Sequence, residues 1–467
     1  MVYKLVCALL PSVFLLRYLY DLKFIPRFMT WIPELLALAA TALILVRLAV
    51  YKRFSIDLKY IYLISVYLLI VIIGIIMNPI TKVELIAGLR VHFKWLPFFI
   101  LPAVYDFSER EFKFLLKIAL FLLLIQVPLG VVQKIYWHYF WGFSSGDFVM
   151  GTGLFSGGLS VVLISGIAIV FSMYLKKYIS RNMCFFLCFF LFIPTALNET
   201  KITVVFLPLA ILMPLMLIEG REYANKTKNL LTGLFLLTFL GAVFVPLYDI
   251  TIKDTGEPGL VDAFLDQNYL TKYLYGGVRG GLGEMKGAVR RGDAVVLAFR
   301  ELSKEPEKLF LGLGVGQVTE TILDSKQGTV GSFLGKRAHY GAEMLVFSHL
   351  LWEVGLAGLL VYVLMIILVF RDALTLRKAE GLLGAFSLGW VVVAVFIGVT
   401  IFYQNNLHHN AINFSFWFFS GVVAAHAARF RCFCSRRNIH AEQWSLYPRT
   451  LLNSPESLTG LRRRREA

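Results

Sequence analysis

The chain has 467 residues, of which 58% are hydrophobic and 15% aromatic, while only 16% are charged. Soluble domains carry about 25% charged residues and cover their apolar side chains within a core. A water-soluble fold could not bury this much apolar surface, so the composition excludes a soluble globular enzyme and indicates a polytopic membrane protein.

Apolar runs of about 20 residues, long enough to cross ~30 Å of hydrocarbon, recur along the sequence. We therefore predict an all-α membrane protein with about 12 transmembrane helices. The first of them resembles a secretion signal, but no small-residue cleavage site follows, so it is interpreted as an uncleaved helix. The predicted spans are residues 3–20, 30–50, 60–77, 86–103, 112–133, 152–175, 183–197, 202–218, 229–248, 345–370, 382–403 and 411–428.

Lysine and arginine in the short loops predict the orientation, because these residues resist translocation. With the N-terminus inside, 13 of them lie in internal loops and 5 in short external loops. The chain then divides into nine helices over 1–248, an external periplasmic loop over 249–344, three helices over 345–428 and a basic cytoplasmic tail over 429–467.

The net charge of +16 reflects this inside bias and a tail with nine arginines. Such a tail is typical of a contact with anionic membrane lipids or of a disordered end, and it does not indicate nucleic-acid binding. The five cysteines, among them Cys184 and Cys188 one helical turn apart, have no histidine partners at ligand spacing. No metal and no other cofactor is therefore predicted.

The long loop has features of its own, because 95 or so residues exceed what a connector needs. Helical periodicity covers residues 259–274 and 286–305, with glycine-rich stretches at 276–283 and at GLGVGQ, 312–317. Two small helices that cap the membrane bundle would account for this pattern. The glycines in GLGVGQ either expose N–H groups that hold an anion or, as we favour, only turn the loop back towards the membrane.

Several basic residues are candidates for binding a phosphate. Arg90 and Lys94 lie four residues apart within a predicted span, so they share a helix face that either lines a polar cavity or snorkels to the surface. Arginine also matches phosphate with a planar fork of donors, although a single surface arginine is more often only solvated. The further candidates are Lys201 at the junction of two spans and Arg279, Arg290 and Arg291 in the loop.

Acid and base candidates gather where the loop meets the tenth span. His339 and Glu343 precede it by a few residues, and an acid at this junction has no evident structural task. His349 and Glu353 lie one turn apart just inside the span, where they are expected to pair with each other. The sequence therefore predicts acid/base chemistry at the membrane interface, beneath the loop.

Three local motifs resemble the superfamily of O-antigen ligases and Wzy-type polysaccharide polymerases, which are bacterial inner-membrane proteins. They are AFRELSKEPEKLFLGLGVGQ (298–317), AEMLVFSHLLWEVGLAGLL (342–360) and LNETKI (197–202). The layout of twelve spans with one large outer loop is similar too. The ligases have a histidine leading the tenth-span motif, whereas here Glu343 or Met344 occupies that position, with His339 and His349 on either side.

This resemblance implies an enzyme that takes a glycan from a polyprenyl diphosphate and transfers it to a hydroxyl with inversion, using neither nucleotide sugar nor metal. Glu343 is then the expected base, with His339 and His349 as alternatives. Arg290, Arg291, Arg279, Lys201, Arg90 and Lys94 are the expected diphosphate contacts. Glutamate at the motif position favours a polymerase, acting with other polysaccharide-assembly proteins, over a ligase to lipid A core or protein.

A membrane transporter or flippase of polysaccharide precursors is the alternative from another class. It too would have about a dozen spans with charges among them. Transporters, however, usually consist of repeated halves, and no repeat is evident in a chain divided into nine spans, a long loop and three spans.

Overall fold

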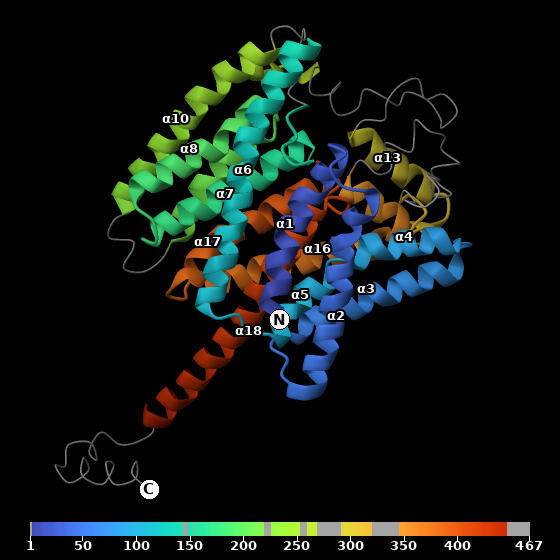
Figure 1. Cartoon of the computed structure of the whole chain (residues 1–467). Helices are drawn as coiled ribbons and strands as arrows, with labels where there is room; N and C mark the ends of the chain where they lie inside the picture. The colour runs from blue at the N-terminus through green and yellow to red at the C-terminus, as the bar shows by residue number, and fades with distance from the viewer. Residues whose placement is uncertain are drawn as a thin grey trace, which may run out of the picture.

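The computed structural model describes residues 2–142, 148–153, 155–218, 226–252, 259–268, 291–319 and 345–445, and within these ranges it contains helices and no strand. Figure 1 shows a bundle of long helices with α18 extending from one end. The helices are α1 (Val2–Asp21), η1 (Arg27–Trp31), α2 (Ile32–Tyr51), α3 (Leu58–Met77), α4 (Lys82–Phe93), α5 (Leu96–Val104), α6 (Glu109–Trp141), α7 (Ser156–Leu175), α8 (Arg181–Leu197), α9 (Thr203–Leu217), α10 (Lys226–Ile252), α11 (Leu260–Leu265), α13 (Arg291–Leu302), α14 (Pro306–Leu311), α16 (Val346–Leu376), α17 (Leu382–Thr400) and α18 (Asn410–Ser445).

Nine of the described helices are long and apolar enough to cross a membrane. The pair α4 and α5 makes a tenth if it is one span, and it is bent by 43°. Each of the predicted spans contains a helix, and the prediction of an all-α polytopic membrane protein is confirmed. The number twelve stays a prediction, because α8 and α9 have only 17 and 15 residues.

The helix α18 continues to Ser445, so the tail expected from residue 429 begins inside a helix (Figure 1). In the long loop, the helix expected over 286–305 is described as α13, whose buried side is made by Ala294, Leu297, Ala298 and Leu302, while Val296 is exposed. The helix expected over 259–274 is described only as α11.

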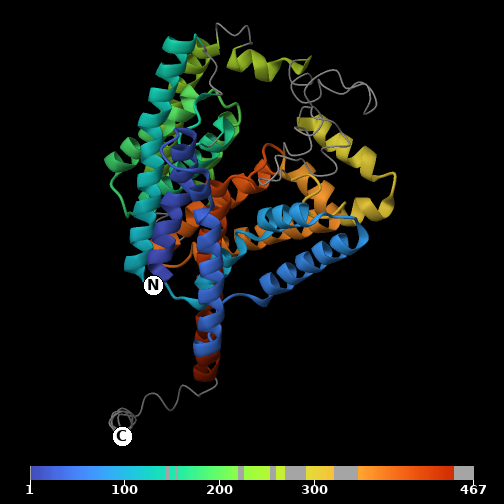
Figure 2. The same cartoon turned by 45° about the vertical axis from the view of Figure 1, so that its right-hand side comes forward.

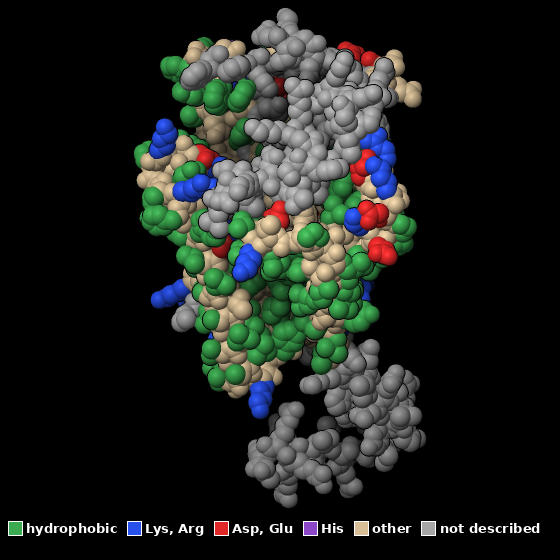
Figure 3. Space-filling view, turned by 90° about the vertical axis from the view of Figure 1, so that its right-hand side faces the viewer, with side chains coloured by type: hydrophobic (Ala, Val, Ile, Leu, Met, Phe, Trp, Pro, Cys, Tyr) green, Lys and Arg blue, Asp and Glu red, His purple; other side chains and the backbone are tan. Residues whose placement is uncertain are grey.

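Consecutive long helices run in opposite directions, so the turns and loops that join them lie at the two ends of the bundle. At the end where α18 emerges, which we name the tail end, Arg371 and Arg431 pair with Asp57, which precedes α3. At the opposite end, the loop end, α13 and α14 pack against α16 (Figure 2). Figure 3 shows a broad hydrophobic band between these ends on one face, with charged side chains mainly above and at the lower edge of the band.

Small residues let the central helices approach closely, as is common where helices pack within lipid. A Cβ at Gly389 of α17 would lie 2.7 Å from the Ile169 Cα of α7. A Cβ at Gly421 of α18 would lie 2.2 Å from the Phe99 carbonyl oxygen of α5, beside the stacked rings of Trp95 and Trp417. The core therefore depends on backbone contacts that larger residues would prevent.

A glycine-rich segment, residues 312–319, runs from α14 back into the bundle, and we name it the strap. Gly312, Gly314 and Gly316 have φ values of 76°, 91° and 91°, which other residues rarely adopt. A Cβ at Gly316 would lie 1.9 Å from the Glu84 carbonyl oxygen of α4, and one at Gly312 would lie 2.5 Å from Glu353. The strap thus passes between α4 and α16 with no room for side chains at these positions.

The helix α16 is broken where it meets the strap. Gly355 has φ 65° and ψ −170°, a conformation essentially restricted to glycine. The break leaves carbonyl oxygens without their helical donors, and two of them accept hydrogen bonds from the strap: Trp352 from the Leu313 N–H at 2.7 Å and Glu353 from the Gly314 N–H at 3.0 Å. The break in one span therefore serves as the attachment point of the long loop.

Gly355→Ala is expected to lower the thermal midpoint of the purified protein strongly. The new Cβ would lie 2.3 Å from the Phe310 carbonyl oxygen, and alanine would be strained at this φ, so a loss of at least ~2 kcal/mol is expected. Gly398→Ala in α17 is the control, because no atom lies within 4 Å of its Cβ. Equal midpoints for the two variants, measured by fluorescence-detected gel filtration after heating, would contradict the described contact.

Candidate functional site

The first turns of α16 form one side of a polar cluster at the loop end. The α17–α18 turn, residues 401–409, lies against them, because its carbonyl oxygens at Ile401 and Gln404 accept hydrogen bonds from the Phe347 and Val346 N–H groups. These N–H groups have no acceptor within their own helix, so the turn caps α16. The capped helix end presents His349 and Glu353 to α4 and to the strap.

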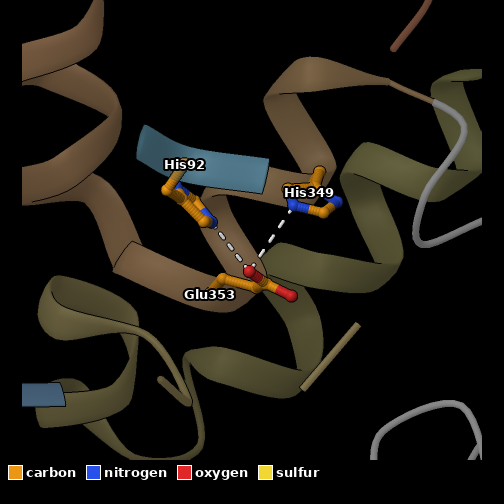
Figure 4. A group of neighbouring side chains, drawn as sticks. All are labelled: His92, His349 and Glu353. Atoms are coloured by element: carbon orange, nitrogen blue, oxygen red, sulfur yellow. Dashed lines mark hydrogen bonds and ion pairs between the residues drawn. The ribbon is translucent and has the colours of Figure 1, made fainter. Parts of the chain in front are cut away.

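The carboxylate of Glu353 is fully buried at the centre of the cluster. Its Oε1 atom accepts three hydrogen bonds from the strap, from the Val318 N–H at 3.0 Å, the Thr319 N–H at 2.9 Å and the Thr319 hydroxyl at 2.9 Å. Its Oε2 atom lies 2.8 Å from Nε2 of His92 and 3.5 Å from Nε2 of His349 (Figure 4). A buried carboxylate needs such compensation, since an isolated charge costs several kcal/mol in an apolar medium.

The two imidazoles have further partners on the side away from the carboxylate. Nδ1 of His92 lies 2.6 Å from the Tyr67 hydroxyl of α3, and Nδ1 of His349 lies 3.5 Å from Nε2 of His408. The side chains of His92 and His349 are both fully buried. The expected pairing of His349 with Glu353 is thus present as the longer of two contacts, and the closer partner of Glu353 is His92.

The basic residues Arg90 and Lys94 reach different neighbours, although they lie four residues apart. Arg90 pairs with Glu34 of α2, with its Nη2 atom 2.6 Å from Oε1, and lies over the Trp31 ring. Lys94 donates to the Asn410 side-chain oxygen at 2.7 Å. The helix is continuous as far as Lys94, whose N–H donates to the Arg90 carbonyl oxygen, so the two long side chains start from one face and diverge towards α2 and α18.

Lys94 is a buried lysine whose described hydrogen bond is to an uncharged group. Its side chain donates to the Asn410 amide and lies 6.0 Å from the centre of the Phe414 ring. Arg90, in contrast, has its charge balanced by Glu34. A lysine held in this way favours a nearby anion, because burial of an ammonium group is costly without one.

Arg291 reaches the α17–α18 turn from the long loop. It begins α13, donates its Nε–H to the Tyr403 carbonyl oxygen at 2.9 Å, and holds its guanidinium over the Tyr403 ring at 4.6 Å. The loop helix therefore brings an arginine to the same turn that carries His408 and precedes Asn410. Lys201 lies in the turn that joins α8 to α9, and Glu199 of the same turn pairs with Lys134 at 2.7 Å.

Two histidines that the sequence analysis did not consider lie in this turn. Burial, together with nearby Lys94 and Arg17, lowers the pKa of His409 to about 3. Burial also holds the pKa of His408 well below its usual value, with His349 and Lys94 contributing. Both imidazoles are therefore neutral near pH 7, and the ring of His409 lies 4.1 Å from that of Phe155.

An apolar groove lies beside this cluster among α1, α6, α7, α17 and α18. Its lining includes Phe14, Leu123, Trp390, Ile412 and Phe416, and nearly all of its surface is apolar. Ile412 follows Asn410, the partner of Lys94, by two residues, so the groove begins close to the buried cation. An apolar channel beside a cation suits an amphipathic anion.

Four of the predicted site residues, His339, Glu343, Arg279 and Arg290, lie outside the described residues. The structure brings together His349, Lys94 and Arg291 around the α17–α18 turn, whereas Arg90 is directed to α2. Sequence reasoning missed the pairing of His92 with Glu353, although His92 stood between two residues that it singled out.

The glycine motif GLGVGQ lies inside the bundle, where the loop returns to it. Its backbone is packed against α4 and α16, and the Leu313 and Gly314 N–H groups are bonded to α16 carbonyl oxygens. The strap does bind an anionic group, but this group is the protein's own Glu353 carboxylate, which accepts hydrogen bonds from the Val318 and Thr319 N–H groups. The favoured interpretation, that the glycines let the loop turn back, agrees with this geometry.

No protein-family model matches the chain, and no curated protein matches it significantly.

Thermal stability is expected to fall on acidification below about pH 6.5, with His409 as one cause. The unfolded imidazole has a pKa of about 6.5 and the folded one about 3, so the unfolded state binds more protons between these values. The free energy of unfolding then decreases by up to ~1.4 kcal/mol per pH unit for each such histidine. Scans at pH 7.5 and pH 5 should show a smaller loss for His409→Asn than for the unmodified protein.

The control for this measurement is His138→Asn, since His138 is exposed on α6. It should keep the full pH dependence. If His409→Asn and His138→Asn lose the same stability on acidification, the low pKa of His409 is wrong.

Proposed function

We propose that the chain is a membrane glycosyltransferase of the polysaccharide polymerase or ligase type. It would transfer oligosaccharide repeats from a polyprenyl diphosphate at the loop end of the bundle, on the periplasmic face of a bacterial inner membrane. The observation that carries the proposal is the gathering of Lys94, Arg291, His349 and His408 around one turn, beside an apolar groove and beneath the loop helices.

The substrate class follows from charge and polarity. A lipid-linked diphosphate has an apolar tail and a head group that gains negative charge when the glycosidic bond breaks. Lys94 and Arg291 would stabilise that charge, and each preorganised donor of this kind contributes about 2–4 kcal/mol in enzymes where it has been removed. The groove bounded by Phe14 and Ile412 suits the tail.

An acceptor hydroxyl must lose its proton as it attacks the anomeric carbon, so the reaction needs a base within hydrogen-bond reach. Glu343 and His339 remain our candidates for this role. His349 is fully buried, so it would act through His408, which is partly exposed and lies 3.5 Å from it. The acceptor that we favour is another repeat, as in an exopolysaccharide or O-antigen polymerase, with transfer to lipid A core or protein as the alternative.

A specific observation also supports the second candidate function, a transporter or flippase of polysaccharide precursors. Transporter sites often lie where helices are interrupted. The bend between α4 and α5 and the break of α16 at Gly355 meet through the contact of His92 with Glu353. The two proposals differ in whether a bond is broken, so the products distinguish them.

The proposal first requires the loop end to face the periplasm. In a cysteine-free variant, Glu307→Cys in α14 should react with a membrane-impermeant maleimide added outside the inner membrane, because Glu307 is exposed at the loop end. Lys378→Cys, exposed at the tail end, should react only after the membrane is permeabilised. The reverse pattern would place the cluster in the cytoplasm and end the proposal.

The catalytic role is tested by two arginines of one helix. Arg291→Ala should reduce long-chain glycan about 100-fold and leave single lipid-linked repeats, because an electrostatic contact to the leaving group is lost. Arg300→Ala is the matched control, since Arg300 is exposed on α13 and pairs with Glu301. Glycans and lipid-linked repeats are extracted from cells that carry each variant and separated by size.

Glu343→Gln should give the same products as Arg291→Ala if Glu343 is the base. Repeats that stay on the cytoplasmic face in both variants would favour the transporter. Unchanged long chains in Arg291→Ala would remove the proposed diphosphate contact.

A further inference from the structure

The two imidazole rings in Figure 4 both point towards one carboxylate oxygen of Glu353. His92 comes from α4, while His349 and Glu353 come from adjacent turns of α16. One ring nitrogen of each histidine and one carboxylate oxygen all lie within 4.8 Å of one another, and the three side chains are fully buried. Two imidazoles and a carboxylate are the donor set of many zinc and other transition-metal sites.

The contacts among the three side chains leave one buried nitrogen unsatisfied. Oε2 of Glu353 is at hydrogen-bond distance from His92, but Nε2 of His349 has no hydrogen-bond partner and faces the same oxygen at 3.5 Å. A buried polar atom without a partner costs about 1–3 kcal/mol. A cation between the three atoms would satisfy this nitrogen and also balance the carboxylate charge.

The outer contacts hold each side chain in the orientation that a metal ligand requires. The Tyr67 hydroxyl contacts Nδ1 of His92, and Nε2 of His408 contacts Nδ1 of His349. If each Nδ1 carries the proton and donates it outward, each Nε2 has its lone pair directed inward. Hydrogen bonds on the far side of the ligands are the usual surroundings of a metal ion, and the strap supplies them to Oε1 of Glu353.

Two of the distances between ligand atoms can be compared with those of a tetrahedral zinc site. Zinc lies about 2.0–2.2 Å from nitrogen and oxygen ligands, which places neighbouring ligand atoms about 3.4 Å apart. The distance from His349 Nε2 to Glu353 Oε2 is 3.5 Å, and the corresponding distance from His92 is 2.8 Å. A shift of His92 by roughly 0.6 Å, within the range of a small side-chain rotation, would admit the ion.

We propose that His92, His349 and Glu353 bind a divalent transition-metal ion of the zinc class. Magnesium and calcium prefer oxygen ligands and fit this donor set poorly. Because the three side chains are fully buried, the assigned role is structural: the ion joins α4, α16 and, through Glu353, the strap that carries the loop helices. The site shares His349 with the proposed glycosyl transfer: as a metal ligand His349 is not the base, which leaves Glu343 and His339 for that role, and no step of the transfer passes through the ion.

The test is the metal content of the intact protein. The chain is purified in detergent through an affinity tag without histidines, and metals are measured by mass spectrometry against protein concentration. About one zinc ion per chain is expected in the unmodified protein. His349→Ala should lower the content to below about 0.1 per chain, while His349→Cys, which restores a zinc ligand, should retain most of it.

His138→Ala is the control variant, because His138 is exposed on α6 and should not affect the metal content. A second measurement avoids variants that fail to fold. The thermal midpoint of the unmodified protein should fall after treatment with 1,10-phenanthroline and recover when Zn²⁺ is added. Metal below about 0.1 per chain, together with a midpoint that neither chelator nor Zn²⁺ changes, would overturn the site and leave a proton shared by His92 and Glu353.

Discussion

The carboxylate of Glu353 is the constraint on which the loop end of the structure depends. A charge placed inside an apolar bundle is stable only if other groups compensate for it, and here the compensation comes from two segments far apart in sequence. The strap donates three hydrogen bonds to one oxygen, and His92 contacts the other. The residues that satisfy this one group therefore also determine how α4, α16 and the long loop fit together.

The break at Gly355 makes this arrangement possible. An unbroken α16 would use the carbonyl groups of Trp352 and Glu353 within the helix, and the strap would have no acceptors. With the break, the strap is bonded at both the backbone and the side chain of Glu353, and apolar contacts of Leu302 and Val318 with Leu351 complete the attachment. The position of α13, and hence of Arg291 against Tyr403, depends on the same attachment.

The sequence was sufficient to predict the membrane class and the place of nearly every helix, because an apolar run of about 20 residues has few other uses. It did not predict the end of α18 at Ser445, since the residues after 428 are polar enough to resemble a tail. The sequence also did not predict the pairing of His92 with Glu353. Their contact depends on a bend, a break and a strap, and none of these has a signal in hydropathy.

The sequence also did not show which partners three polar residues at the end of α4, Arg90, His92 and Lys94, would contact. Arg90 and Lys94 start from one face of a continuous helix, because the Lys94 N–H donates to the Arg90 carbonyl oxygen. Their long side chains nevertheless diverge: Arg90 pairs with α2 and Lys94 with Asn410 of α18, while His92 pairs with α16. One short segment thus joins three helices through three polar contacts, each of a different charge type.

The partners of Arg90 and His92 also show that these two side chains have structural roles. Arg90 is neutralised by Glu34, and His92 is committed to Glu353, so neither is available to a ligand without breaking a buried contact. The described hydrogen bond of Lys94 is to the uncharged Asn410 amide, and its amine lies near the Phe414 ring. An anion that enters beside the α17–α18 turn would therefore gain most from Lys94, and it would do so without disturbing the contacts that hold the loop in place.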